Sequence, residues 1–128
     1  MKKLFVILLF SLSFSVSAHE QWYQCTVQQF YVLGDGGKLE AKAEGYEGEV
    51  FRVNRSANII VGDKINSIYN HEVVASNPSE QGIYSLVNYS RKVDGQIRRL
   101  LSLTIQDFAE VKPFVLAEGN YIFTGTCR

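Results

Sequence analysis

Apolar and polar side chains alternate along most of the chain beyond residue 21, and this period of two predicts β-strands with one buried face. Seven runs rich in aromatic and β-branched residues predict strands at 22–32, 50–53, 59–61, 68–75, 83–91, 96–106 and 121–127. The sixth run alternates most cleanly, and its apolar face is expected to carry Ile97, Leu101, Leu103 and Ile105. Only Arg99 interrupts that face, and a position near a hairpin tip is expected to let its side chain reach solvent.

The first run is apolar on both faces, and the turns between later runs are short. One face is expected to carry Tyr23, Cys25, Val27 and Tyr31, and the other Trp22, Thr26 and Phe30. Asp94-Gly95 predicts a tight hairpin between two of the runs. Asn58 is expected in the left-handed conformation, closing the turn that begins at Asn54. About seven antiparallel strands predict an all-β fold, either a small barrel or a sandwich.

The segment 38–44 departs from the strand pattern. It contains good helix formers, Leu-Glu-Ala-Lys-Ala-Glu, between Gly37 and Gly45. Two predictions stay open for it, a helix of under three turns and a flexible acidic loop.

A chain of 128 residues is too short for a second domain.

Residues 1–18 predict a secretory signal peptide. Lys2 and Lys3 precede an apolar run, and the segment ends in the short residues Val16-Ser17-Ala18. A membrane anchor would need about 20 apolar residues, whereas serines interrupt this run. We therefore expect a single domain at 19–128 that is periplasmic or secreted, without membrane insertion after the signal is removed.

The two cysteines, Cys25 and Cys127, predict a disulfide bond. An exported chain enters an oxidising compartment, where such a pair is expected to form a bridge. The bond would join the two ends of the domain and stabilise it by about 4 to 5 kcal/mol in the chain-entropy model. The alternatives are metal ligation and a catalytic thiol. The sequence supports neither, because it contains no CxxC motif and few other candidate soft ligands.

Charge and motif content narrow the function. Thirteen basic side chains balance 13 acidic ones, so no net field attracts nucleic acid or an anionic membrane. The sequence contains no GxSxG, P-loop, helix-opening GxGxxG or HExxH motif. We expect neither enzymatic activity nor a cofactor.

A cluster of cations surrounds the Asp94-Gly95 turn, and it comprises Arg91, Lys92, Arg98 and Arg99. Asp94 is the one acidic residue in the same stretch. The cluster is the candidate binding patch, because it could attract an acidic partner. Alternatively, cations near a hairpin tip prevent the edge strands from pairing with other chains.

A copper site is a second, weaker hypothesis. Cleavage after Ala18 would make His19 the new amino terminus, where its amine and imidazole could bind copper, with His71 as a third nitrogen ligand. No further His supports this arrangement, so the preferred prediction is that the protein holds no metal.

Three short motifs lie far apart in the chain: Phe-Arg-Val-Asn-Arg at 51–55 followed by Gly62, Lys-Pro-Phe-Val at 112–115, and Phe-Thr-Gly-Thr-Cys at 123–127. Together they resemble a family of small exported bacterial proteins of uncharacterised function. That family shows Phe-x-Val-Asp-Arg-x-x-Gly, an early cysteine and a final Thr-Gly-x-Cys, whereas this chain has Asn54 for the Asp and Asn58 for the turn Gly. The resemblance implies a bacterial envelope protein with a disulfide, and it implies no activity.

These observations predict an exported binding or inhibitory module that recognises a protein or a ligand of the cell envelope. The alternatives are a lipocalin-like carrier of a small apolar ligand and a copper-binding protein. A carrier needs an apolar cavity, whereas an inhibitor displays loop residues on a filled core. Whether eight large residues fill the core or line a cavity distinguishes the two functions, and these residues are Phe30, Tyr31, Phe51, Leu101, Leu103, Ile105, Tyr121 and Phe123.

Overall fold

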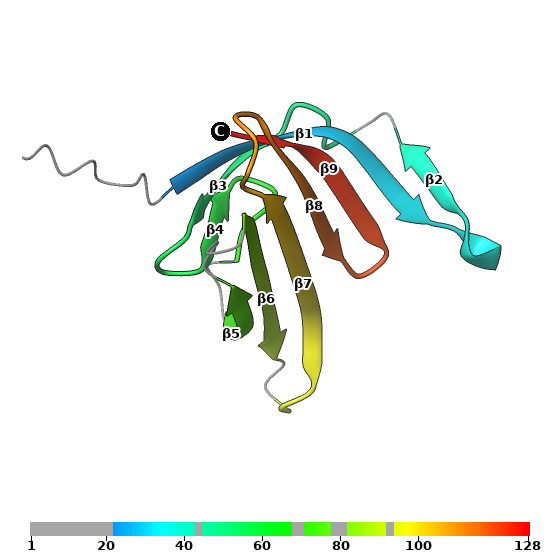
Figure 1. Ribbon diagram of the computed structural model, residues 1–128. Helices are drawn as coiled ribbons and strands as arrows, with labels where there is room; N and C mark the ends of the chain where they lie inside the picture. Colours follow the sequence, from blue (N-terminus) through cyan, green and yellow to red (C-terminus); the bar gives the residue numbers. More distant parts are fainter. Residues whose placement is uncertain (1–21, 43–44, 68–70, 78–81, 92–93) are drawn as a thin grey trace, which may run out of the picture.

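The structure, a computed structural model, is an antiparallel β-sheet curled into half a barrel (Figure 1). It describes residues 22–42, 45–67, 71–77, 82–91 and 94–128, with the backbone alone for 71–72, 74–77 and 91. The strands are β1 (Trp22–Leu33), β2 (Leu39–Lys42), β3 (Val50–Asn54), β4 (Ile59–Gly62), β5 (His71–Asn77), β6 (Ile83–Arg91), β7 (Ile97–Gln106), β8 (Lys112–Glu118) and β9 (Tyr121–Cys127). Eight strands follow the order β4-β3-β1-β9-β8-β7-β6-β5, and β2 pairs with β1.

The predicted all-β antiparallel fold is confirmed, and a strand is present in each of the seven predicted runs. The fourth runs from His71 to Asn77, later than the predicted 68–75, of which 68–70 lie outside the described residues. Strands β2 and β8 are additions to the prediction. In β8, buried Phe114 and Leu116 alternate with exposed Val115, and Pro113 lies near the start of the strand, where a missing N–H is tolerated.

The segment 38–44 forms neither of the two predicted structures. A short 3₁₀ turn, η1 (Asp35–Gly37), leads into β2, which pairs with β1 from Leu33↔Leu39 to Phe30↔Lys42. A helix this short gains few internal hydrogen bonds, whereas a strand can pair along its length with a neighbour already in place. Residues 43–44 lie outside the described part.

A β-bulge in β1 overturns the predicted faces of that strand. The register with β9 passes from Val27↔Gly125 to Gln29↔Thr124, so Gln28 is the extra residue. Beyond the bulge Phe30 is buried and Tyr31 is only half-buried, the reverse of the prediction. Gly125 permits this close approach, because a Cβ there would lie 2.0 Å from the carbonyl oxygen of Thr26.

Side chains fill the concave side of the sheet. Phe51 meets Phe114 edge to face with ring centroids 5.2 Å apart, and Phe30 stacks on Phe123 at 5.1 Å. Of the eight residues chosen to separate a carrier from an inhibitor, six are buried, and they are Phe30, Phe51, Leu101, Leu103, Ile105 and Phe123. Tyr121 is exposed and Tyr31 is half-buried.

The predicted disulfide is confirmed. Cys25 in β1 lies directly opposite Cys127 in β9, their sulfur atoms are 2.03 Å apart, and both residues are fully buried. The bond therefore joins the first and last strands at neighbouring positions in the sheet. Over the ranges that the structure describes, no helix has the length and apolar character needed to cross a membrane.

Candidate binding groove

An open groove lies where strand β7 runs past the end of β8. Ile97, Arg99 and Leu100 pair with β6, and Arg98 is the extra residue of a bulge between them. Pairing of β7 with β8 begins only at Leu101↔Glu118, where Glu118 is the last residue of β8. The step between the longer β6–β7 hairpin and the shorter β8–β9 hairpin leaves a hollow of about 450 Å³. Side chains from β7 and from the β8–β9 hairpin line it, among them Arg98, Arg99, Leu100, Glu118, Asn120 and Tyr121.

Arg99 forms an ion pair across this groove. Its Nε donates to Oε1 of Glu118, and its Nη2 donates to Oε2 at 2.6 Å. Arg99 shares the inward face of β7 with Leu101, and Glu118 lies opposite Leu101, so the pair stands at the open end of the core. The Arg99 side chain is 37% exposed, so it reaches solvent in part as expected, while its guanidinium group pairs with an acidic residue from outside the hairpin. The adjacent strand supplies a counter-ion, which allows a charge on an otherwise apolar face.

Arg98 is a groove cation for which the described residues supply no counter-ion. Its side chain is exposed, and among the described residues it takes part in no ion pair. Of the four predicted cations, the structure thus brings Arg98 and Arg99 to one groove. Lys92 and the side chain of Arg91 lie outside the described part of the chain.

Strands β6 and β7 form the predicted hairpin, but Asp94-Gly95 lies within the connection 92–96 and not in a two-residue turn, because β6 ends at Arg91 and β7 begins at Ile97. Gly95 has a φ of +83°, and the carboxylate of Asp94 accepts a hydrogen bond from the backbone N–H of Gln96 at 3.0 Å. The predicted apolar face of β7 is correct except for Ile97, which is 58% exposed. The register with β6 passes from Ser90↔Arg99 to Arg91↔Ile97, so the bulge at Arg98 turns Ile97 away from the face that carries Leu101.

The rest of the groove is partly apolar. Leu100 and Tyr121 are 53% and 44% exposed, while Asn120 and Ser102 add an amide and a hydroxyl group. The arrangement can bind a carboxylate at Arg98 and an apolar group beside Leu100 and Tyr121.

Sequence reasoning missed the residues that the β8–β9 hairpin contributes, namely Glu118, Asn120 and Tyr121. The dipeptide Gly119-Asn120 between two apolar runs is a hairpin signal and could have located the turn. It could not have placed Glu118 beside Arg99, because that contact depends on the register of β7 with β8.

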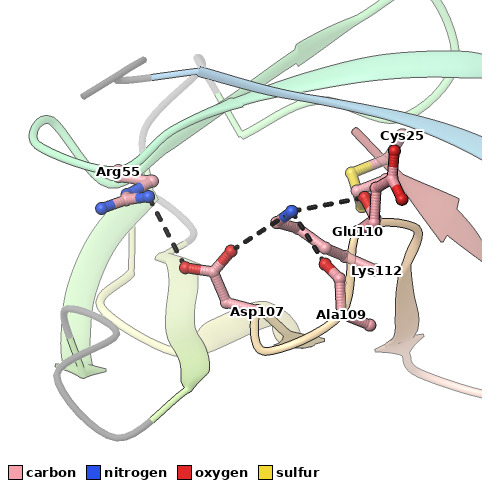
Figure 2. A network of polar contacts seen from close by, with 7 residues as sticks. Cys25, Arg55, Asp107, Ala109, Glu110 and Lys112 are labelled. Atoms are coloured by element: carbon pink, nitrogen blue, oxygen red, sulfur yellow. Dashed lines mark hydrogen bonds and ion pairs between the residues drawn. A yellow bond between two sulfur atoms is a disulfide. The ribbon is translucent and has the colours of Figure 1, made fainter. Parts of the chain in front are cut away.

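A second polar cluster lies at the other end of β7. Figure 2 shows the carboxylate of Asp107 between Arg55, 3.6 Å away, and Lys112, 3.8 Å away. Arg55 and Lys112 belong to two of the three motifs, and Lys112 lies opposite Cys127 of the third in the sheet. In this chain the motif residues therefore meet at one corner and serve packing and turn formation, and they do not line the groove.

Tyr84 is buried beside this corner. Burial raises the pKa of its hydroxyl to about 12, and the positive charge of Arg55 lowers it in part. The hydroxyl donates a hydrogen bond to Oδ1 of Asn58 at 3.0 Å. Tyr84 is thus a neutral donor that fastens β6 to the β3–β4 turn, in which Asn58 has the predicted left-handed conformation with a φ of 54°.

The copper hypothesis concerns residues outside this description. His19 precedes the described part, and only the backbone of His71 is described, paired with Ser90. Within the described ranges no three His, Cys, Asp or Glu side chains gather into a metal site. A copper site remains a sequence-based hypothesis.

The chain matches no protein-family model, no curated protein and no solved structure.

Proposed function

We propose that the protein is an exported binding module that holds an acidic, extended segment of a partner protein in the groove beside β7. One observation carries the proposal: Arg98, without a counter-ion among the described residues, lies beside exposed Leu100 and Tyr121 where β7 has no β8 neighbour. A carboxylate of the partner would bind Arg98, and an apolar residue would cover Leu100 and Tyr121.

Backbone geometry supports an extended occupant. Alternate residues of a strand direct their N–H and C=O groups to opposite edges, so part of 97–100 presents these groups away from β6. A partner segment could then add beside β7 as a further strand, with backbone hydrogen bonds giving affinity and side chains giving specificity. The buried disulfide agrees with an oxidising compartment such as the periplasm.

The filled interior favours this function over the carrier. Aromatic rings from β1, β3, β8 and β9 pack against one another where a lipocalin-like protein would hold its ligand. A binding surface on the outside of a filled core needs no such cavity.

The proposal is tested by charge reversal. A partner is first isolated from envelope extract with the mature protein as bait and then purified. Its affinity is measured for the wild type, Arg98→Glu and Arg128→Glu. Arg98→Glu should weaken binding about tenfold, chiefly through the association rate, and should reduce its dependence on salt. Arg128 is an exposed cation that follows the last residue of β9, at the opposite end of that strand from the groove residue Tyr121, so Arg128→Glu should leave affinity within about twofold. Equal effects of the two variants would contradict the proposal.

Arg99 provides a separate control for folding. Arg99→Glu places two carboxylates together and should lower the free energy of unfolding by about 1 kcal/mol. The exchange Arg99→Glu with Glu118→Arg should recover most of that loss. Arg98→Glu should change stability by less than about 0.5 kcal/mol, which separates recognition from folding.

A further inference from the structure

The turn 107–111 between β7 and β8 displays a large aromatic side chain. Phe108 is 71% exposed, and Val111 in the same turn is 51% exposed. The groove lining reaches Ser102, five residues before Asp107, so at about 3.3 Å per residue the turn begins about 16 Å farther along the chain from the groove. Anything that binds here therefore uses a surface distinct from the groove.

Polar contacts hold this turn in place (Figure 2). Asp107 pairs with Arg55 and Lys112 through its carboxylate, and its backbone N–H donates to the carbonyl of Gly82 at 2.7 Å. The ammonium group of Lys112 donates to the carbonyl oxygens of Ala109 at 2.9 Å and Glu110 at 3.4 Å. Contacts from β3–β4, β6 and β8 thus fix the turn on several sides.

Phe108 lies close to the backbone of Gly82, which has a φ of +76°. A Cβ added at Gly82 would come within 3.2 Å of the Cβ of Phe108. The next residue, Ile83, is 40% exposed. We call these three exposed apolar residues of the turn and its neighbour, Ile83, Phe108 and Val111, the Phe108 tip.

The charges around the Phe108 tip argue for a protein partner and against a lipid surface. Two cations that contact this turn, Arg55 and Lys112, both face the carboxylate of Asp107. Glu110 is exposed beside them and adds negative charge. These charges give no attraction to an anionic membrane. A protein pocket with an apolar floor and a cation at its rim would be complementary to Phe108 and Glu110.

We propose that the Phe108 tip is a preformed docking element that inserts the ring of Phe108 into an apolar pocket of a partner protein, with Glu110 facing a cation at the rim of that pocket. Buried aromatic side chains commonly dominate binding energy at interfaces. A turn already held in one conformation loses little further freedom on binding, which favours affinity. This inference does not depend on the proposed function of the groove, since no residue is shared between the two surfaces.

Site-specific photocrosslinking identifies the occupant. The full chain is produced in its own cells with para-benzoylphenylalanine at position 108 or, as the matched control, at position 115, where Val115 is 50% exposed on β8. A protein captured at 108 is identified by mass spectrometry and purified. Its affinity is then measured for the wild type, Phe108→Ala, Glu110→Lys and Val115→Ala, after melting curves have shown that each variant is folded.

We expect Phe108→Ala to weaken binding at least about 30-fold, the size of an aromatic hot spot. Glu110→Lys should weaken it about threefold to tenfold, and Val115→Ala less than about twofold. The proposal is wrong if capture at 108 does not exceed capture at 115, or if Phe108→Ala and Val115→Ala bind equally. Crosslinking of a second copy of this chain alone, or Phe108-dependent cosedimentation with phosphatidylglycerol vesicles, would also overturn it. Arg98→Glu should leave this affinity unchanged, so failure of the groove proposal would be recognised separately.

Discussion

Removal of the Cys25–Cys127 disulfide should destabilise the protein mainly by releasing its unfolded chain. The bond spans a sequence separation of 102 residues. In the chain-entropy model a cross-link over a loop of about this length stabilises the fold by about 4.7 kcal/mol at 25 °C. Domains of this size have a total stability of about 5 to 15 kcal/mol, so the loss would leave a marginally folded protein.

Urea unfolding of three samples measures the effect: the oxidised wild type, the wild type reduced with dithiothreitol, and Cys25→Ala with Cys127→Ala. The reduced protein keeps both sulfur atoms in the fully buried site, so it isolates the cross-link from the loss of packing. We expect the reduced protein to lose about 3 to 5 kcal/mol and the double variant to lose at least as much. The denaturant slope should rise in both, because an unconstrained chain exposes more surface when it unfolds.

Two results would refute this reasoning. A loss below about 1 kcal/mol on reduction would mean that the unfolded state is not appreciably constrained by the bond. A large loss with an unchanged denaturant slope would place the effect in the native sheet, where β1 and β9 meet at this residue pair.

Substitutions at three further positions test how the fold is built. Gly125→Ala should destabilise the protein by more than about 3 kcal/mol in urea unfolding, because the added Cβ would lie 2.0 Å from the carbonyl oxygen of Thr26. A loss no larger than that of an ordinary surface substitution would argue against the bulge. Asn54→Ala should lower the free energy of unfolding by about 1 kcal/mol, because the Asn54 side chain accepts hydrogen bonds from two backbone N–H groups of the turn at 3.0 and 2.8 Å. Asn54→Asp keeps an acceptor oxygen at this position, so urea unfolding should show that it retains most of this stability. Tyr84 has its pKa raised to about 12 in the folded state, so its contribution to stability is complete below pH 10 and is lost as the pH rises toward 12. Unfolding measured between pH 9 and pH 12 should show a smaller decline in Tyr84→Phe than in the wild type, and identical declines would count against the burial of this hydroxyl.

The sequence by itself determined the local features of this protein. Alternation placed the long strands because the period of two is a property of each strand alone. Turn chemistry placed the left-handed residue at Asn58 and the hairpin at Asp94-Gly95, since these conformations depend on a few neighbouring residues. The pairing of Cys25 with Cys127 followed because the chain has no other cysteine.

The tertiary structure decided the features that depend on which strands become neighbours. The bulge at Gln28 reversed the faces of Phe30 and Tyr31, because it forms against Gly125, a residue almost a hundred positions later in the chain. Strand β2 exists because β1 offers it an edge, although its own residues favour a helix.

The candidate surfaces arose in the same way. Four cations could be counted in the sequence, but the register of β7 with β8 paired Arg99 with Glu118 and left Arg98 without a counter-ion among the described residues. The Phe108 tip is fixed by an ion-pair cluster that joins Arg55 to a turn more than fifty residues away. Strand order and register set these contacts, and a local pattern of side chains contains neither, because they result from the packing of the whole sheet.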